Sequence, residues 1–221
     1  MPKPQVMPMS QVPRVAPPES KVFIIVTSLN AHIHAELVGR LITWARRGAF
    51  ISCILGVSPV DHARNEAVRT FIKPEFGNYT HFMFVDDDTI PPPDAVSKLL
   101  ALNADIATGV TPIMRKDEEN KIYTTTNCFT SIENDGEFIN METVEENSGI
   151  HEVLRCGASC LMLSRKAIET IGDPWFKITW TPDFKSYVGE DLSFCDLARS
   201  KGLKIVCDSS VSCAHFKHIM L

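Results

Sequence analysis

The sequence contains no long apolar run, and this absence excludes a membrane-spanning helix. Such a helix needs about 20 consecutive apolar residues, and no run in the 221 residues approaches that length. The first twenty residues also lack the apolar segment of a signal peptide. We therefore predict a cytoplasmic protein without a membrane span.

Cysteine occurs seven times, but no two cysteines have the CxxC spacing of common metal-binding or redox motifs. The odd number does not favour a framework of disulfides. Cys53 and Cys160 lie inside apolar runs, as buried thiols do. The sequence thus predicts reduced cysteines in a reducing compartment.

An excess of positive charge is also absent. The chain carries 22 Lys and Arg residues against 27 Asp and Glu residues, a formal net charge of -5. This balance argues weakly against non-specific binding to nucleic acid or to anionic membranes. It leaves room for a small basic patch at a site.

The length fits one domain with a sizeable core. Residues 1–20 are rich in proline and contain little that could pack, so we predict a flexible arm there. From Lys21 onward the sequence contains apolar runs, and we predict that residues 21–221 form the domain.

Apolar periodicity alternates between strand and helix in the first half of the domain. The predicted elements are a strand at 22–26, a helix at 33–44, a strand at 50–55, a helix at 58–73, a strand at 81–85, a helix at 91–100 and a strand at 106–110. The strand at 22–26 has the pattern of burial on both faces, the strand at 50–55 is predicted to be a second buried strand, and Ser58 is predicted to be the N-cap of the second helix. This order predicts a single α/β domain with a mostly parallel, doubly wound sheet.

The second half is less regular. Residues 127–150 are polar and acidic and predict an excursion or mobile loop rather than a core element. A strand within 154–163, a helix at 165–171, a helix from 189 and a strand at 203–207 are predicted to follow.

Three consecutive carboxylates, Asp86-Asp87-Asp88, follow the strand at 81–85. In doubly wound sheets ligands bind beyond the carboxyl ends of the strands. Like charges there repel one another and resist desolvation. A divalent cation offsets that cost, and oxygen ligands suit Mg²⁺ or Mn²⁺, which also bind phosphate oxygens. The alternative is an acidic turn in which Asp88 or Thr89 caps the next helix.

Glu190 and Asp191 open a predicted helix after Gly189. The helix dipole favours acidic residues in a first turn, so simple capping is one explanation. The functional explanation is that one carboxylate acts as general base for an acceptor hydroxyl.

A histidine, His215, follows the last predicted strand and can complete a metal site begun by the aspartates. Its imidazole would favour Mn²⁺ over Mg²⁺. One alternative is a solvated C-terminal tail. Another is a structural zinc site formed by Cys207, Cys213, His215 and His218, whose spacing matches common zinc patterns poorly.

The order of these three blocks resembles the glycosyltransferase-A fold, especially family-2-like enzymes of bacterial and phage type. The resemblance covers about residues 21–217: a strand ending in a DxD motif, an ED motif at a helix start and a late histidine. It implies one Rossmann-like nucleotide-diphospho-sugar transferase domain. It also implies metal-dependent transfer of one sugar from a nucleotide-diphosphate donor, expected to be UDP-linked, to an acceptor hydroxyl.

The resemblance assigns the donor side of the site to the first half of the chain. Thr27 is expected to contact the base, and Arg64 the nucleotide or its phosphates; the alternative for Arg64 is a surface charge on an amphipathic helix. Asp86 is expected to face the ribose or sugar and to share in binding the metal, with Asp87 beside it. Asp88 is expected to ligate Mn²⁺ or Mg²⁺ directly.

The remaining roles fall in the second half. His215 is expected to be a further metal ligand. Asp191 resembles the catalytic base of inverting members, and Glu190 beside it is expected to orient the acceptor or the base. Trp175, Trp180 and Tyr187 flank these residues, and aromatic faces often stack on sugar rings, although core packing is the alternative.

The chain departs from the family's processive synthases, because it lacks their Q-x-x-R-W motif and C-terminal membrane segments. A single addition to a glycan or to a hydroxymethylated DNA base is therefore expected. Basic pairs that could form a patch for DNA are Arg46-Arg47, Arg115-Lys116 and Lys201-Lys204.

Two other classes compete with a glycosyltransferase. A nucleotidyltransferase normally has a glycine-rich, basic loop after its first strand, and residues 27–30 contain neither glycine nor lysine. A non-catalytic nucleotide- or sugar-binding module, or a zinc-stabilised interaction domain, would not need both the triple aspartate and the Glu190-Asp191 pair.

Overall fold

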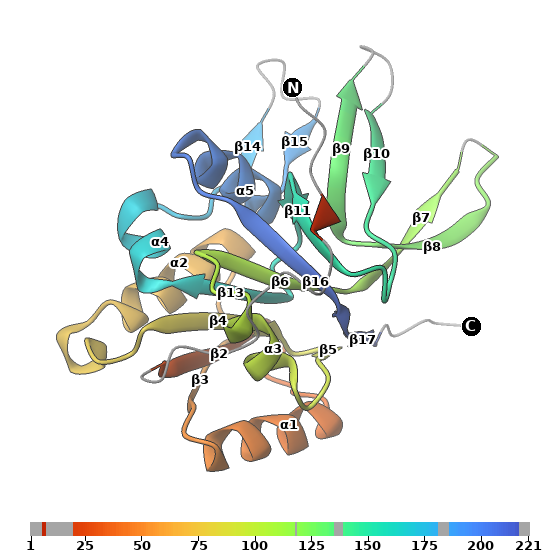
Figure 1. Cartoon of the computed structure of the whole chain (residues 1–221). Coiled ribbons are helices and arrows are strands. Elements are labelled where there is room, and N and C mark those ends of the chain that lie inside the picture. Colours follow the sequence, from red (N-terminus) through yellow and green to blue (C-terminus); the bar gives the residue numbers. More distant parts are fainter. Residues whose placement is uncertain (1–5, 8–19, 118, 135–138, 181–185, 217–221) are drawn as a thin grey trace.

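A central sheet of eight strands organises the computed structural model, which describes residues 6–7, 20–117, 119–134, 139–180 and 186–216 (Figure 1). From one edge to the other, its strands are β1 (Val6–Met7), β11 (Ile150–Val153), β16 (Ile205–Ser212), β6 (Ile106–Val110), β13 (Cys160–Ser164), β4 (His81–Asp86), β2 (Val22–Ser28) and β3 (Phe50–Leu55). Strands β11 and β13 run opposite to their neighbours, and the other strands point one way. The predicted α/β class with a mainly parallel sheet is confirmed.

Helices cover both faces of this sheet and divide the core into two layers. On one face lie α2 (Val60–Phe71), α4 (Arg165–Ile171) and α5 (Glu190–Ser200); on the other lie α1 (Ala35–Arg46) and α3 (Ala95–Ala101). A short 3₁₀ helix spans Pro74–Phe76. The strands supply alternate residues to the two layers: Phe23 packs with α2, whereas Ile24 packs with α1. Burial of each such side chain contributes about 1.5–3 kcal/mol, so the inner strands are firmly held.

Strand β3 lies at the edge of the sheet, which corrects the prediction that 50–55 is a buried strand. Phe50 and Leu55 are exposed, and so is Cys53, which was predicted to be a buried thiol. The other six cysteines are buried, and all seven are free. Helix α2 is capped by Pro59 without a side-chain hydrogen bond, so the predicted cap at Ser58 is wrong.

Residues 127–150 were predicted to form an excursion or mobile loop, and this prediction is wrong where the structure describes them. Strands β9 (Cys128–Asn134) and β10 (Ile139–Thr143) pair antiparallel, and β12 (Arg155–Cys156) joins β9 on its other side. Burial of Cys128, Phe129 and Val144 holds this small sheet on the main core despite its polar composition.

Three short ribbons complete the fold. They are β7 (Pro112–Lys116) with β8 (Ile122–Thr126), β14 (Thr179–Trp180) with β15 (Tyr187–Val188), and β5 (Thr89–Ile90) with β17 (Ala214–His215). Within the predicted arm, Val6–Met7 pair with β11 as strand β1. The division into an arm at 1–20 and a domain at 21–221 stays a prediction. In the part of the chain described here, no helix is long and apolar enough to cross a membrane.

Candidate functional site

The candidate site lies where β2 and β4 end. Parallel pairing places Thr27 of β2 directly beside Asp86 of β4, and Asp87 and Asp88 follow where the chain leaves the sheet. Strand β13 runs antiparallel beside β4, and the Asp86 N–H donates to the Ser159 carbonyl at 3.2 Å. A cavity of about 390 Å³ opens at this edge, a size suited to a small-molecule ligand.

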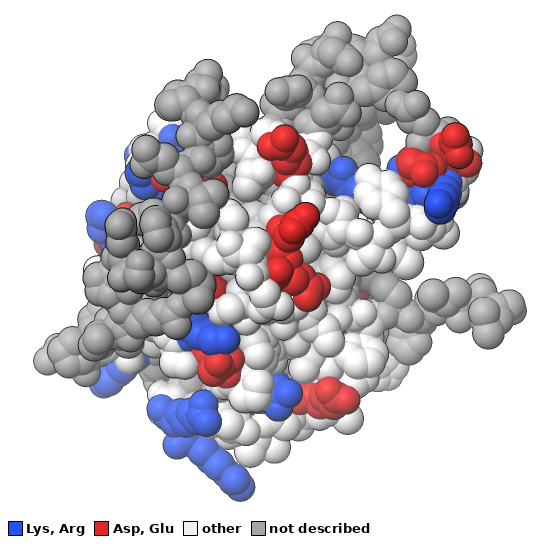
Figure 2. Space-filling model, turned by 45° about the vertical axis from the view of Figure 1, so that its right-hand side comes forward, with Lys and Arg blue, Asp and Glu red and all other residues white. Residues whose placement is uncertain are grey.

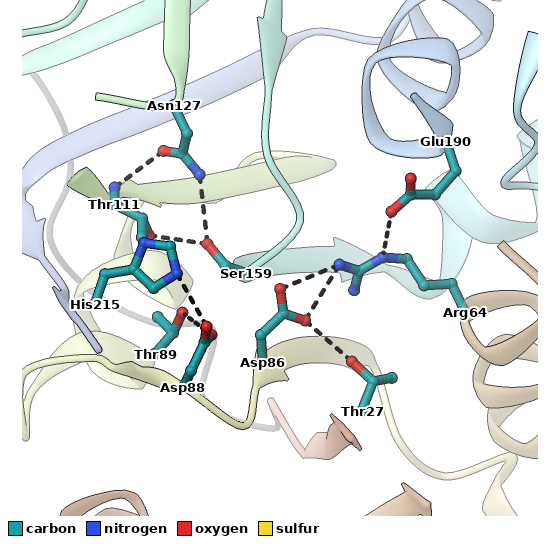
Figure 3. Close-up of polar contacts among 10 residues, drawn as sticks. All are labelled: Thr27, Arg64, Asp86, Asp88, Thr89, Thr111, Asn127, Ser159, Glu190 and His215. Atoms are coloured by element: carbon teal, nitrogen blue, oxygen red, sulfur yellow. Dashed lines mark hydrogen bonds and ion pairs between the residues drawn. The ribbon is translucent and has the colours of Figure 1, made fainter. Parts of the chain in front are cut away.

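His215 reaches Asp88 through strand pairing. Ribbon β5–β17 sets His215 opposite Thr89, the residue after Asp88, and the Phe216 N–H donates to the Asp88 carbonyl at 2.8 Å. The His215 Nε2 consequently lies 3.2 Å from the Asp88 Oδ2 (Figure 3). A short segment of backbone pairing thus joins residues that are 127 positions apart.

The tautomer of His215 follows from its second contact. Its Nδ1 lies 2.8 Å from the Pro112 carbonyl oxygen, which can only accept a hydrogen bond, so Nδ1 carries a proton. The contact of 3.2 Å between Nε2 and the Asp88 Oδ2 then holds a second proton, and loss of that proton frees the Nε2 lone pair beside the carboxylate. A carboxylate oxygen and an imidazole nitrogen in this arrangement fit Mn²⁺ or Zn²⁺ as ligands. The Pro112 carbonyl orients the ring through its Nδ1–H, as a second hydrogen bond usually does for a metal-binding histidine.

Asp86 points away from that pair and toward Arg64. The Arg64 Nη2 donates to the Asp86 Oδ2 at 3.2 Å, and the Thr27 hydroxyl donates to Oδ1 at 3.0 Å (Figure 3). Asp86, predicted to share in binding metal, is therefore not gathered with Asp88 and His215. Among the described residues, no group of three or more His, Cys, Asp or Glu side chains converges as a cation site.

Arg64 is buried, with only 4% of its surface exposed. The alternative that Arg64 is a surface charge on an amphipathic helix is therefore wrong. Its Nε donates to the Glu190 Oε1 at 3.0 Å, and its guanidinium lies over the Phe84 ring. Burial lowers the pKa of Arg64, but the Asp86 and Glu190 carboxylates raise it more, so it stays charged. Glu190, also buried, is directed at Arg64 and is not among the residues that line the cavity.

Asp87 accepts a hydrogen bond from the Ser28 hydroxyl, and the Asp87 carbonyl accepts one from the N–H of His34 at 3.2 Å. Each carboxylate of the run therefore has its own protein partner: Arg64 for Asp86, Ser28 for Asp87 and His215 for Asp88. The charge of Asp86 is thus offset by Arg64, whereas a cation was predicted to offset it.

Asp191 lines the same cavity from the first turn of α5. Burial and, after it, the neighbouring Glu190 charge raise its pKa to about 6, against the lowering effect of Arg64 and of the Leu192 N–H. A carboxylate with this pKa is largely ionised at neutral pH yet is a better proton acceptor than an ordinary aspartate. Perturbed acids of this kind are common at functional sites.

The cavity brings together most of the predicted residues. Its lining includes Thr27, Arg64, Asp86, Asp87, Asp88, Asp191 and His215. It also includes Ser28, Thr111, Asn127 and Ser159. None of these four is among the residues predicted to form the site, since isolated polar residues at strand ends carry no motif. Ser159 stands in a Gly-Ala-Ser segment whose glycine is the one available signal.

The zinc alternative does not match the structure. Cys207 belongs to the core layer packed under α2, α4 and α5, whereas Cys213 belongs to the layer under α1 and α3. The sheet separates the two thiols, and His215 is directed at Asp88. His218 lies outside the described residues.

Within the described ranges, the basic pairs predicted to form a patch do not come together. Arg46-Arg47 end α1, Arg115-Lys116 end β7, and Lys201 follows α5, three places that lie far apart (Figure 1). Figure 2 likewise shows Lys and Arg at several separate places on one face, at the left, at the lower left and at the upper right, with Asp and Glu among them. The patch suggested for DNA from these pairs is therefore not formed.

The aromatic residues near Asp191 divide by burial. Trp175 is buried and donates from its ring nitrogen to the Ile168 carbonyl, so it packs in the core. Trp180 and Tyr187 are exposed on β14 and β15, with ring centroids 5.1 Å apart.

Comparison with known proteins places the fold. No protein-family model matches the chain, and no curated protein matches its sequence significantly. Among solved structures, A197 from STIV matches with a TM-score of 0.59 and 16% identity, over 90% of this chain and 86% of that one. The glycosyltransferase GalNAc-T7, crystallised with UDP, GalNAc and Mn²⁺, matches with a TM-score of 0.55 and 9% identity, over 90% of this chain and 43% of its own.

The fold is glycosyltransferase-A-like. At such low identities the likeness concerns the fold alone, and the family-2 assignment stays a prediction. The glycosyltransferase-A-like fold agrees with a site at the carboxyl ends of parallel strands, because ligands bind there in open α/β sheets.

Proposed function

We propose that this chain is a metal-dependent glycosyltransferase that moves one sugar from a UDP-sugar to an acceptor hydroxyl. One observation carries the proposal: the Asp88–His215 pair and the high-pKa Asp191 line a single cavity of about 390 Å³. The glycosyltransferase-A-like fold supports it. So does GalNAc-T7, a protein of similar fold that was crystallised with UDP and Mn²⁺.

Asp88 and His215 are the residues that would hold the cation. Two protein ligands suffice when the remaining positions are filled by phosphate oxygens and water, as is usual for such ions at phosphate sites. The imidazole favours Mn²⁺ over Mg²⁺. When bound, the cation would neutralise the charge that develops on the departing nucleoside diphosphate.

Arg64, Asp86 and Thr27 form the donor side of the site. Thr27 and Arg64 both donate to Asp86, which fixes its carboxylate at the cavity wall, where it can accept from a ribose or sugar hydroxyl. The Arg64 Nη1 is buried and has no hydrogen-bond partner in the described part of the chain. A buried donor left over in this way supports a ligand contact for Arg64. Glu190 holds the guanidinium in place and acts as a positioning residue.

Asp191 acts as the general base. As the acceptor oxygen forms its bond to the anomeric carbon, the bond from that carbon to the diphosphate oxygen breaks, and the hydroxyl proton passes to the Asp191 carboxylate. Direct displacement of this kind inverts the anomeric configuration. The acceptor is a glycan or a hydroxymethylated DNA base, and the expected location is cytoplasmic.

The test is release of UDP from UDP-sugars in the presence of Mn²⁺. We expect Asp191→Asn to reduce transfer at least 100-fold, as loss of a general base does, while UDP binding stays near the wild-type level. Asp196→Asn is the matched control: it changes an aspartate of the same helix whose carboxylate pairs with Arg155 and does not line the cavity. Wild-type turnover in Asp191→Asn would remove Asp191 as the base.

The same assay separates the competing functions. A non-catalytic nucleotide- or sugar-binding module would bind UDP-sugars and release no UDP. A nucleotidyltransferase would release pyrophosphate from a nucleoside triphosphate instead. The loop at 27–30, without glycine or lysine, disfavours the latter.

A further inference from the structure

The wall of the cavity formed by Thr111, Asn127 and Ser159 is polar but uncharged. These residues are buried, with exposed fractions of 1%, 7% and 9%, and all line the cavity. They come from three separate segments, after β6, after β8 and before β13. Figure 3 shows them together on one side of the site, above the carboxylates of Asp86 and Asp88.

Hydrogen bonds fix the orientation of this cluster. The Thr111 N–H donates to the Asn127 Oδ1 at 2.9 Å, which identifies the oxygen of the amide and turns Nδ2 toward Ser159. The Ser159 hydroxyl donates to the Thr111 Oγ1 at 2.9 Å, and the Asn127 Nδ2 lies 3.4 Å from the Ser159 Oγ. Since the last contact is long, Nδ2 and the Ser159 oxygen retain capacity for a ligand.

The backbone next to the cluster leaves space for the Asn127 side chain and is fixed by hydrogen bonds. A Cβ on Gly157 would lie 2.5 Å from the Asn127 Nδ2, so only glycine lets the amide occupy this position. The Gly157 N–H donates to the Asn127 carbonyl at 2.9 Å, and the Asp86 N–H donates to the Ser159 carbonyl. These bonds tie the uncharged wall to the carboxylate wall.

We propose that the Thr111–Asn127–Ser159 cluster binds a hydroxyl group of the sugar carried by the donor. This inference rests on the proposed function. A cation and a diphosphate belong with Asp88, His215 and Arg64, whereas neutral amide and hydroxyl groups match the donor and acceptor pattern of a sugar hydroxyl. A site built to bond a hydroxyl selects against ligands that lack or misplace it, so the cluster sets donor specificity.

The experiment compares the affinity for UDP with the affinity for UDP-glucose, UDP-galactose, UDP-GlcNAc and UDP-GalNAc, all with Mn²⁺, by titration calorimetry. The variants are Thr111→Val and Ser159→Ala. The matched controls are Thr108→Val and Ser209→Ala, which remove hydroxyls that are also buried and hydrogen-bonded but do not line the cavity. The ratio of the two affinities within one variant is independent of how much of the sample is folded.

We expect the preferred UDP-sugar to bind wild type more tightly than UDP, and Thr111→Val and Ser159→Ala to lose about ten-fold of that advantage. We expect both control variants to keep the full advantage of the UDP-sugar over UDP, and all variants to bind UDP alone with the same affinity. The inference is overturned if both cluster variants keep the tighter binding of the UDP-sugar. It is also overturned if wild type binds UDP but binds no UDP-sugar more tightly than UDP. Either result leaves the proposed donor site standing. Failure of wild type to bind UDP or any UDP-sugar overturns the proposed function together with it.

Discussion

At the scale of single residues, the site manages three adjacent negative charges by giving each a different partner. Asp86 has a buried guanidinium, Asp87 a hydroxyl and Asp88 an imidazole. The partners differ in what a ligand can displace. A cation can replace the proton between His215 and Asp88, whereas the Arg64–Asp86 contact is an ion pair that persists without ligand.

Removal of His215 tests the cation site directly. We expect His215→Ala and Asp88→Ala each to weaken Mn²⁺-dependent binding of UDP by at least ten-fold, because each removes one of two protein ligands. Titration calorimetry with and without EDTA measures this. His151→Ala, on β11 and not among the cavity residues, serves as control and should bind normally. Equal affinity in the presence and absence of EDTA for wild type would refute metal dependence.

Removal of Arg64 should be costly for stability. Arg64→Met leaves Asp86 and Glu190 as buried or half-buried carboxylates without their cation, and breaking such a pair costs roughly 3–5 kcal/mol. Arg69→Met removes another ion-paired arginine from the same helix, but one whose side chain is 38% exposed against 5% for Arg64, and should cost about 0–1 kcal/mol. Urea unfolding measures both, and similar losses in the two variants would contradict a buried clamp.

At the scale of elements, apolar patterns predicted the inner strands well and the edges poorly. β2 and β4 carry continuous apolar runs because both of their faces are covered. β3 has the same composition but lies at the edge, and no residue within it reports its place in the sheet. β9 and β10 lie in a stretch of polar and acidic composition that hides the few residues that hold this sheet on the core, Cys128, Phe129 and Val144. Nothing in the sequence of β13 shows that it runs antiparallel to its neighbours.

The candidate site divides in the same way. Asp86–Asp88, Asp191 and His215 were predicted because their types and order form motifs, and the cavity contains them all. Ser28, Thr111 and Asn127 were not predicted, because only strand pairing between distant segments brings them to the cavity. Glu190 was predicted beside Asp191, but helical geometry turns adjacent residues about 100° apart, so it meets Arg64 instead.

Two glycines predict opposite effects on packing between elements. A Cβ on Gly109 in β6 would lie 2.4 Å from the Val211 carbonyl oxygen of β16, so Gly109→Ala should destabilise the protein by roughly 1–3 kcal/mol. Gly39 in α1 has open space around it, so Gly39→Ala should stabilise it by about 0.5–1 kcal/mol. Thermal unfolding measures the two shifts, and a Gly109→Ala variant as stable as wild type would contradict the close approach of β6 and β16.

At the scale of the whole molecule, Asp191 makes stability depend on pH. Its pKa of about 6 in the fold exceeds the value of about 3.9 in an unfolded chain, so the folded state binds more protons between these values. Stability is therefore lost as pH rises from about 4 to about 6, by up to roughly 3 kcal/mol. The same ionisation creates the base, so activity should rise through pH 6.

Asp191→Asn removes that ionisation. In EDTA and without donor, we expect the variant to be more stable than wild type above pH 6 and to match it near pH 4. Urea unfolding at a series of pH values gives the difference in the free energy of unfolding between variant and wild type. Asp196→Asn is the control for the effect of neutralising any aspartate of α5. A difference between Asp191→Asn and wild type that does not change with pH would exclude Asp191 as the source.

The pairing of β5 with β17 also governs when the protein can begin to work during its synthesis. His215 is translated 127 residues after Asp88, which takes on the order of 6–25 s at 5–20 residues per second. The nascent chain can complete β2, β3 and β4 long before this, yet the imidazole that faces Asp88 has not been made. A chain still on the ribosome thus carries its aspartates without their last partner, and the activity proposed for it starts only after residue 215 has emerged.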